Sequence, residues 1–114
     1  MPGRELRKFQ RIPCDHRAVL EVGRTRERAA VTVRTLSFGG VGVTFDEWDA
    51  QVMEAGADVV IHVALGPVEL DLPGHVAWCD PSHYRRFDLG IVLDLQRAHP
   101  AMRDAYLGWV RSAL

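Results

Sequence analysis

The residues with the clearest capacity for ligand chemistry are basic side chains near the N-terminus. Arg7, Lys8 and Arg11 lie in a polar segment, and the two arginines have the spacing Arg-x-x-x-Arg. Residues 1–34 hold nine of the 14 bases and four of the 15 acids, although the net charge of the chain is −1. This split indicates a localised site for an anion rather than a generally basic protein. The spacing alone is not diagnostic, because the chain contains a second instance of it.

A second group of residues combines hydroxyl groups with glycines, in the order Thr35-Leu36-Ser37-Phe38-Gly39-Gly40. Thr35 and Ser37 are two residues apart, so both hydroxyls can face the same way on an extended chain. Gly39 and Gly40 permit positive φ and a close approach of the backbone to a ligand. Taken alone, the segment is typical of a hairpin turn.

Motifs for catalysis and metal binding are missing from the sequence. There is no Gly-x-Ser-x-Gly, no phosphate-binding loop with its lysine, and no dinucleotide-binding fingerprint. Cys79, Asp80 and His83 offer two or three metal ligands from one turn, whereas a structural zinc needs four. We therefore expect a protein that is not an enzyme and that uses no cofactor and no metal.

The same survey bears on compartment and on large partners. The most apolar run, residues 59–65, is far too short to cross a bilayer, and the first residues do not resemble a signal peptide. With only two cysteines and no disulfide framework, we expect a cytoplasmic protein without membrane insertion. Because residues 35–114 carry an excess of acids, we expect no DNA binding.

Most of the chain alternates apolar and polar residues with a period of two, which predicts strands with one apolar face. The apolar positions of these segments include Ala18, Leu20, Val22, Val31, Val33, Val41, Val43, Phe45, Val59, Ile61, Val63, Leu70, Leu72, Val76, Trp78, Leu89, Ile91 and Leu93. Six or seven such strands are typical of an antiparallel barrel or sandwich. Gly66-Pro67 and Pro73-Gly74 predict turns between strands.

The C-terminal segment changes to helical periodicity. Met102, Tyr106, Trp109, Val110 and Ala113 fall on one face of a helix, and Pro100 suits its first turn. The pattern predicts a helix over about 99–113 that closes one mouth of the barrel or docks on its side. The fold class is therefore all-β with a C-terminal helix, in a single domain.

Together, these motifs resemble those of the PilZ domain, a family of bacterial receptors for cyclic di-GMP (c-di-GMP). The family pattern is an N-terminal Arg-x-x-x-Arg followed by [Asp/Asn]-x-Ser-x-x-Gly. Arg7 and Arg11 match the first motif, and Ser37 and Gly40 match the second. Segments 56–59, 75–78 and 89–93 also resemble family strands. The resemblance implies a six-stranded antiparallel β-barrel over residues 15–114 and a basic arm over residues 1–14.

The resemblance also implies which residues bind the ligand. They are Arg7, Lys8, Arg11, Thr35, Ser37, Gly39, Gly40 and Trp78. An arginine fork can engage guanine O6 and N7 and can stack on a base, and Trp78 offers a further stacking face. Thr35 stands where the family has Asp or Asn, and its hydroxyl accepts from one donor where a carboxylate accepts from both guanine N1–H and N2–H. We therefore predict weakened binding.

The function implied is that of a single-domain c-di-GMP effector. Ligand binding would order the arm across the barrel and present a surface to a protein partner. One alternative is a PilZ-like adaptor that has lost nucleotide binding and acts through protein contacts, in motility or surface attachment; Thr35 is its main support. Another is a small barrel for single-stranded nucleic acid, although the sequence shows no ladder of exposed aromatic residues.

Overall fold

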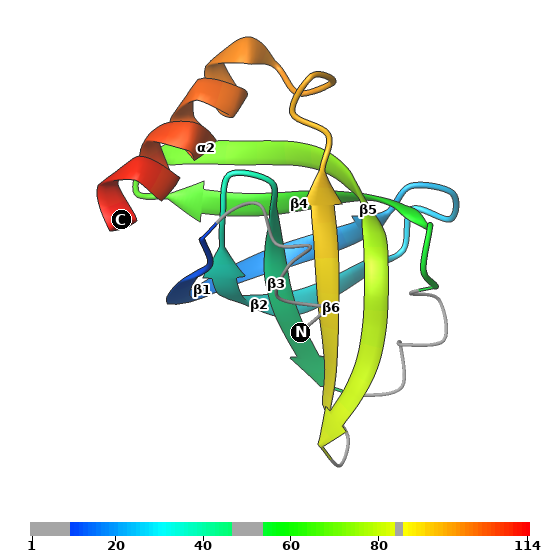
Figure 1. Cartoon of the computed structure of the whole chain (residues 1–114). Coiled ribbons are helices and arrows are strands. Elements are labelled where there is room, and N and C mark those ends of the chain that lie inside the picture. Colours follow the sequence, from blue (N-terminus) through cyan, green and yellow to red (C-terminus); the bar gives the residue numbers. More distant parts are fainter. Residues whose placement is uncertain (1–9, 47–53, 84–85) are drawn as a thin grey trace.

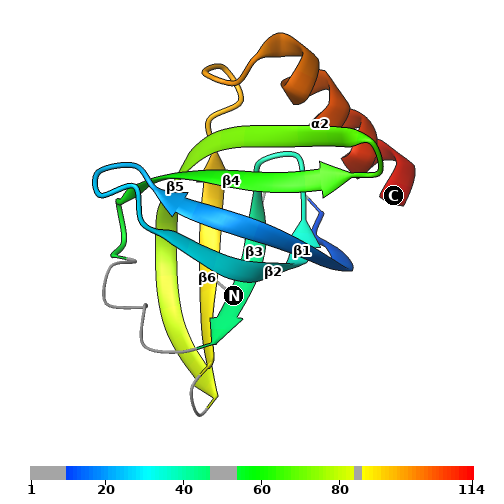
Figure 2. The same ribbon diagram turned by 180° about the vertical axis from the view of Figure 1, so that it is seen from behind.

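The computed structural model describes residues 10–46, 54–83 and 86–114. It confirms the predicted fold, a closed barrel of six antiparallel strands with a C-terminal helix (Figures 1 and 2). The elements are β1 (Ile12–Val22), β2 (Arg28–Leu36), β3 (Gly40–Asp46), β4 (Asp58–Leu65), β5 (Val68–His83), β6 (Arg86–Leu93) and α2 (Pro100–Ala113). The order around the barrel is β1-β2-β3-β6-β5-β4.

The period-two pattern of the sequence accounts for the core. In β4, for example, Val59, Ile61 and Val63 are buried, while the residues between them face outwards. Each strand contributes such a face, and together with Tyr106 and Val110 of α2 they form a single apolar cluster. Burying one such side chain contributes about 1.5–3 kcal/mol, so the alternation determines which face of each strand points into the barrel.

The strand β5 differs from its prediction. Pro73-Gly74 is not a turn but a corner within one strand of 16 residues. Residues 68–75 pair with β4, and residues 74–83 pair with β6. At Gly74 an added Cβ would meet the carbonyl oxygen of Val92, so the missing side chain lets β6 approach at this corner.

The boundary between arm and barrel also differs from the prediction. β1 begins at Ile12, which is buried and pairs with Leu36 of β2. Residues 12–14, which we expected in the arm, therefore belong to the barrel. An apolar residue at position 12 followed by Pro13 masks this start, because proline is uncommon in a paired strand.

The helix α2 lies across one end of the barrel (Figures 1 and 2). Pro100 occupies its first turn, and the side chain of His99 accepts a hydrogen bond from the backbone N–H of Ala101 at 3.1 Å. Tyr106 and Val110 are fully buried, as the helical pattern predicted. Among the described residues, no helix is both long and apolar enough to cross a membrane.

Candidate functional site

The first feature of the site is a bulge in β2. The pairing of β2 with β1 and its pairing with β3 both shift register at Arg34, which has no direct partner in either strand. Between buried Val33 and Leu36, the two residues Arg34 and Thr35 therefore both lie on the outer face of the barrel. Bulges commonly redirect a side chain in this way next to functional sites.

A second bulge lies in β5, at the other side of the same surface. The register with β6 shifts between Val76 and Trp78. Val76 is buried, whereas Ala77 and Trp78 are both exposed, and 40% of the surface of Trp78 is accessible to solvent. The indole that the sequence suggested for stacking is therefore on the outer face and accessible.

Two glycines form the floor between these bulges. The register aligns Thr35, Gly42, Gly90 and Trp78 in one row across β2, β3, β6 and β5. An added Cβ at Gly42 would lie 2.5 Å from Oγ1 of Thr35, and one at Gly90 would collide with the indole of Trp78. The hydroxyl of Thr35 thus covers Gly42, and the indole of Trp78 covers Gly90. We call this row of two covered glycines the glycine floor.

The turn between β2 and β3 carries Ser37, Phe38, Gly39 and Gly40. It is closed by the backbone N–H of Ser37, which donates to the carbonyl of Gly40 at 2.9 Å, and the Ser37 hydroxyl donates to the same oxygen at 3.2 Å. An added Cβ at Gly40 would collide with the carbonyl oxygen of Ile91 in β6. Ser37 and Gly40 therefore have a structural role in the barrel that does not depend on a ligand.

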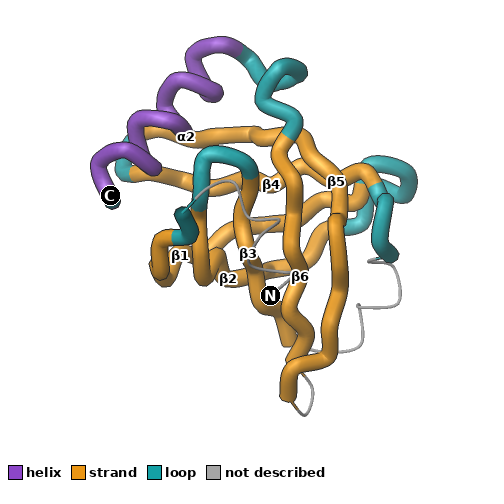
Figure 3. The backbone as a smooth tube through the Cα atoms, viewed as in Figure 1, coloured by secondary structure: helices purple, strands orange, loops and turns teal. Residues whose placement is uncertain are grey.

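The helix α2 is tied to this turn, which Figure 3 shows in teal beside the helix. The phenol of Tyr106 donates to the carbonyl of Ser37 at 2.5 Å and lies 3.1 Å from that of Gly40. Burial raises the pKa of Tyr106 well above its ordinary value, so the phenol keeps its proton. Phe38 and Arg111 extend the contact, with the guanidinium 6.0 Å from the ring centroid.

Of the predicted basic residues, the structure describes Arg11. It is exposed and immediately precedes β1, in which Ile12 pairs with Leu36 and Pro13 with Thr35. Arg11 therefore adjoins the paired ends of β1 and β2, next to the segment that holds Thr35 and leads into the Ser37 turn. Arg7 and Lys8 lie outside the described residues.

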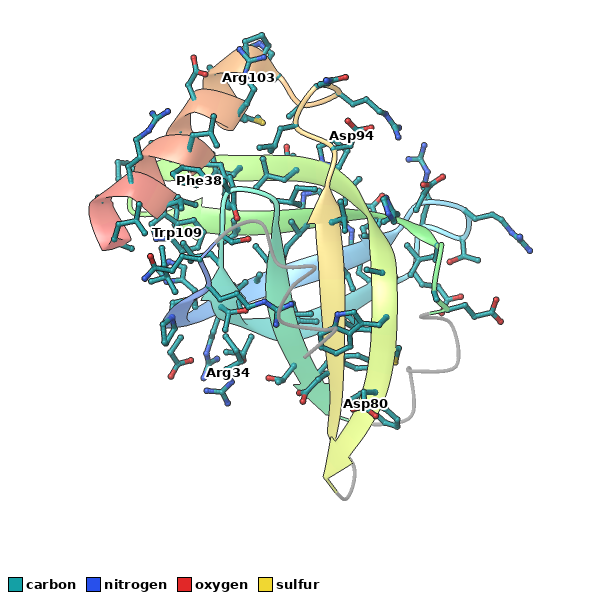
Figure 4. All side chains as sticks on the ribbon, viewed as in Figure 1. Arg34, Phe38, Asp80, Asp94, Arg103 and Trp109 are labelled. Atoms are coloured by element: carbon teal, nitrogen blue, oxygen red, sulfur yellow. The ribbon has the colours of Figure 1, made fainter. Side chains whose placement is uncertain are left out.

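Charges of both signs border the glycine floor. Arg34 donates to the hydroxyl of Thr44 at 3.3 Å and lies 3.9 Å from Asp15. On the other side, Asp80 of β5 and Asp88 of β6 face each other in register. Figure 4 shows Arg34 and Asp80 on opposite sides of β3 and β6. Burial, and then Asp80 and Asp88, raise the pKa of the Cys79 thiol, which is therefore a poor nucleophile.

Another polar cluster lies on a different part of the barrel. The imidazole of His62 contacts Asp71 at 2.6 Å and Glu21 at 3.0 Å, and Arg28 lies 3.0 Å from Glu21. The hydrogen bond from His62 and the charge of Arg28 hold the pKa of Glu21 below its ordinary value. Within the described ranges, no group of three or more His, Cys, Asp or Glu residues is arranged to hold a metal ion.

Several residues of this surface were missed at the level of sequence. Gly42 and Gly90 carried a signal, since a glycine inside a strand pattern marks a close approach. Tyr106 carried a weaker one, since a buried phenol needs a hydrogen-bond partner, but the sequence does not say which. Asp88 carried none, because its neighbours come from β3 and β5.

Comparison with known proteins agrees with this architecture. A family model described as PilZ domain matches residues 5–106. No curated protein matches the chain. Among solved structures, the chain is similar to the PilZ domain with c-di-GMP of YcgR from Escherichia coli, with a TM-score of 0.74, 12% identity, and coverage of 95% of this chain and 91% of that one.

Two further structures are similar over nearly the whole chain. The Bacillus subtilis inhibitor of motility, MotI/DgrA, gives a TM-score of 0.70 at 10% identity, over 93% of this chain and 50% of that one. Borreliella burgdorferi PlzA in complex with c-di-GMP gives a TM-score of 0.65 at 17% identity, over 96% of this chain and 43% of that one. The chain therefore spans about half the length of these two proteins.

Proposed function

Because this chain belongs to the PilZ domain family, we propose that it is a c-di-GMP receptor that binds the dinucleotide on the outer face of β2, β3, β6 and β5. The observation that carries the proposal is the row of Thr35, Gly42, Gly90 and Trp78 across the outer face, which begins beside the β1–β2 pairing that Arg11 precedes and ends at an exposed indole.

Each part of this surface has a use in dinucleotide recognition. The guanidinium of Arg11 can engage guanine O6 and N7 as a fork or attract a phosphate. The two glycines let Thr35 and the indole of Trp78 lie close to the barrel, and the exposed indole supplies a stacking face for a base. The hydroxyl of Ser37 donates to Gly40, which leaves its lone pairs to accept from a base.

We further propose that ligand binding orders the N-terminal arm against this face, with Arg7 and Lys8 contributing charge next to Arg11. Two phosphate groups attract such a basic segment. The surface formed by the ligand and the arm then differs from that of the free protein, which gives a protein partner something to recognise.

The test is calorimetric titration of the protein with c-di-GMP. We expect a saturable isotherm, which Arg11→Ala weakens at least tenfold, because a hydrogen bond between charged groups contributes about 1.5–3 kcal/mol. Arg24→Ala is the matched control, since Arg24 is an exposed arginine in the β1–β2 turn. Absence of heat and of chemical-shift changes at saturating ligand would reject the receptor function.

A second candidate is an adaptor that acts through protein contacts alone. Two observations favour it. Ser37 and Gly40 have structural roles in the barrel that need no ligand, and Thr35 offers only one hydroxyl. If the wild-type protein is silent in the titration and Thr35→Asp binds, the surface is a nucleotide site that has lost its acceptor, and the adaptor is the better description.

A further inference from the structure

We propose that Asp88 of β6 is a specificity-determining residue of this surface and accepts hydrogen bonds from the donor edge of a guanine. The inference rests on the proposed c-di-GMP function. It assigns to the acidic side of the site a role that the two sequence motifs do not provide.

The starting observation is an unsatisfied oxygen. Among the described residues, Oδ1 of Asp88 is the one buried side-chain oxygen or nitrogen without a hydrogen-bond partner. An acceptor left unpaired away from water destabilises the folded state. Such an atom in a native structure calls for an explanation, and one explanation is a donor that arrives with a ligand.

The position of Asp88 fits this explanation. Asp88 and Gly90 are two residues apart on β6 and share its outer face, because Leu89 between them is buried. Two residues along a strand span about 7 Å, so a base stacked on the indole that covers Gly90 can present an edge to Asp88. Trp78 pairs with Gly90 and Asp80 with Asp88, so the indole and the carboxylates border one patch.

The chemistry of the base selects a carboxylate. Guanine presents N1–H and N2–H side by side as donors, and a carboxylate accepts from both. Thr35 and Ser37 each offer a single hydroxyl oxygen, and the described basic residues of the site have no acceptor to give. Asp88 is only partly buried as a residue, so rotation about its side-chain torsions turns the carboxylate outwards without moving the strand.

Asp80 is the natural comparison, because it lies directly opposite Asp88 and carries the same charge. It is exposed and therefore hydrated, so it gains less from an incoming donor than a desolvated oxygen does. Asp80 and Asp88 repel each other, so a neutral or positively charged group next to either of them is favourable. These differences make Asp80→Asn the matched control for Asp88→Asn.

The experiment measures affinities for c-di-GMP and for its inosine analogue, cyclic di-IMP, which lacks only the N2 amino group. We expect the wild type to prefer c-di-GMP about tenfold, as one charged hydrogen bond would give. Asp88→Asn should weaken c-di-GMP about tenfold, affect cyclic di-IMP less, and bring the ratio of the two affinities towards one. Asp88→Ser should give the same change in ratio, and Asp80→Asn should retain the wild-type ratio.

The outcomes separate this inference from the function on which it rests. If the wild type binds neither dinucleotide, both fail. If it binds and Asp88→Asn keeps the wild-type ratio, the receptor function stands and Asp88 is not the reader of the base. Equal weakening of both ligands also rejects the inference, because it shows that Asp88 does not read the N2 amino group.

Discussion

At Gly40, the smallest possible change tests whether the barrel or the ligand requires the residue. A Cβ there would collide with the backbone carbonyl of Ile91, and backbone atoms of a paired strand cannot yield as a flexible side chain can. We expect Gly40→Ala to lower the free energy of unfolding by about 1–3 kcal/mol in urea denaturation without ligand. An unchanged urea midpoint would mean that β3 and β6 can move apart to accept the methyl group without loss of stability.

The control for this substitution lies in the helix. Gly108 of α2 is exposed, and an added Cβ there meets nothing within 4 Å. Alanine is favoured over glycine in a helix interior by about 0.8–1.0 kcal/mol. Gly108→Ala should therefore raise the urea midpoint, so the same chemical change has opposite signs at the two positions.

The carboxylate of Glu21 makes stability depend on pH. Its pKa is lowered in the folded state, chiefly by the hydrogen bond from His62, so its contribution is complete above the ordinary value of 4.5 and is lost as pH falls through the folded value. We expect the difference in Tm between wild type and Glu21→Gln to shrink as pH falls from about 5 to about 3. Glu69→Gln, which removes an exposed carboxylate, should not reproduce this trend.

At the scale of elements, the contact between α2 and the β2–β3 turn can be tested by removing a single oxygen atom. Tyr106→Phe removes the phenol oxygen that donates to Ser37 and retains the buried ring. We expect a loss of about 0.5–1.5 kcal/mol in stability and faster amide exchange at Ser37 and Gly40. If exchange in the turn is unchanged, the helix does not hold the turn in place.

The elements themselves were predictable to different degrees. The alternation of residues such as Val59, Ile61 and Val63 is local, so it predicts strands and their inner faces correctly. Pro73-Gly74 has the composition of a turn, and only the pairing of β5 with both β4 and β6 makes it a corner. The motif match identified Thr35, but the bulge that turns it outwards depends on registers with β1 and β3.

At the scale of the whole molecule, the closed barrel joins the site to global stability. The floor is built from β3 and β6, which are paired to each other along their length, so a ligand that binds there stabilises the folded state as a unit. At 100 times the Kd, c-di-GMP should add about 2.7 kcal/mol and raise Tm by about 10 °C. Arg11→Ala should abolish most of this shift in a thermal scan, and Arg24→Ala should not.

The double use of the β2–β3 turn also bears on descent. A lineage that abandoned the nucleotide would still be selected for Gly40, because a side chain beside Ile91 destabilises the barrel. Position 35 is under no such demand, since the Thr35 hydroxyl leans over a glycine on the outer face. We therefore expect position 35 to change long before Gly40 does. The glycine would then indicate descent from the family, and the residue at position 35 would indicate whether the nucleotide is still bound.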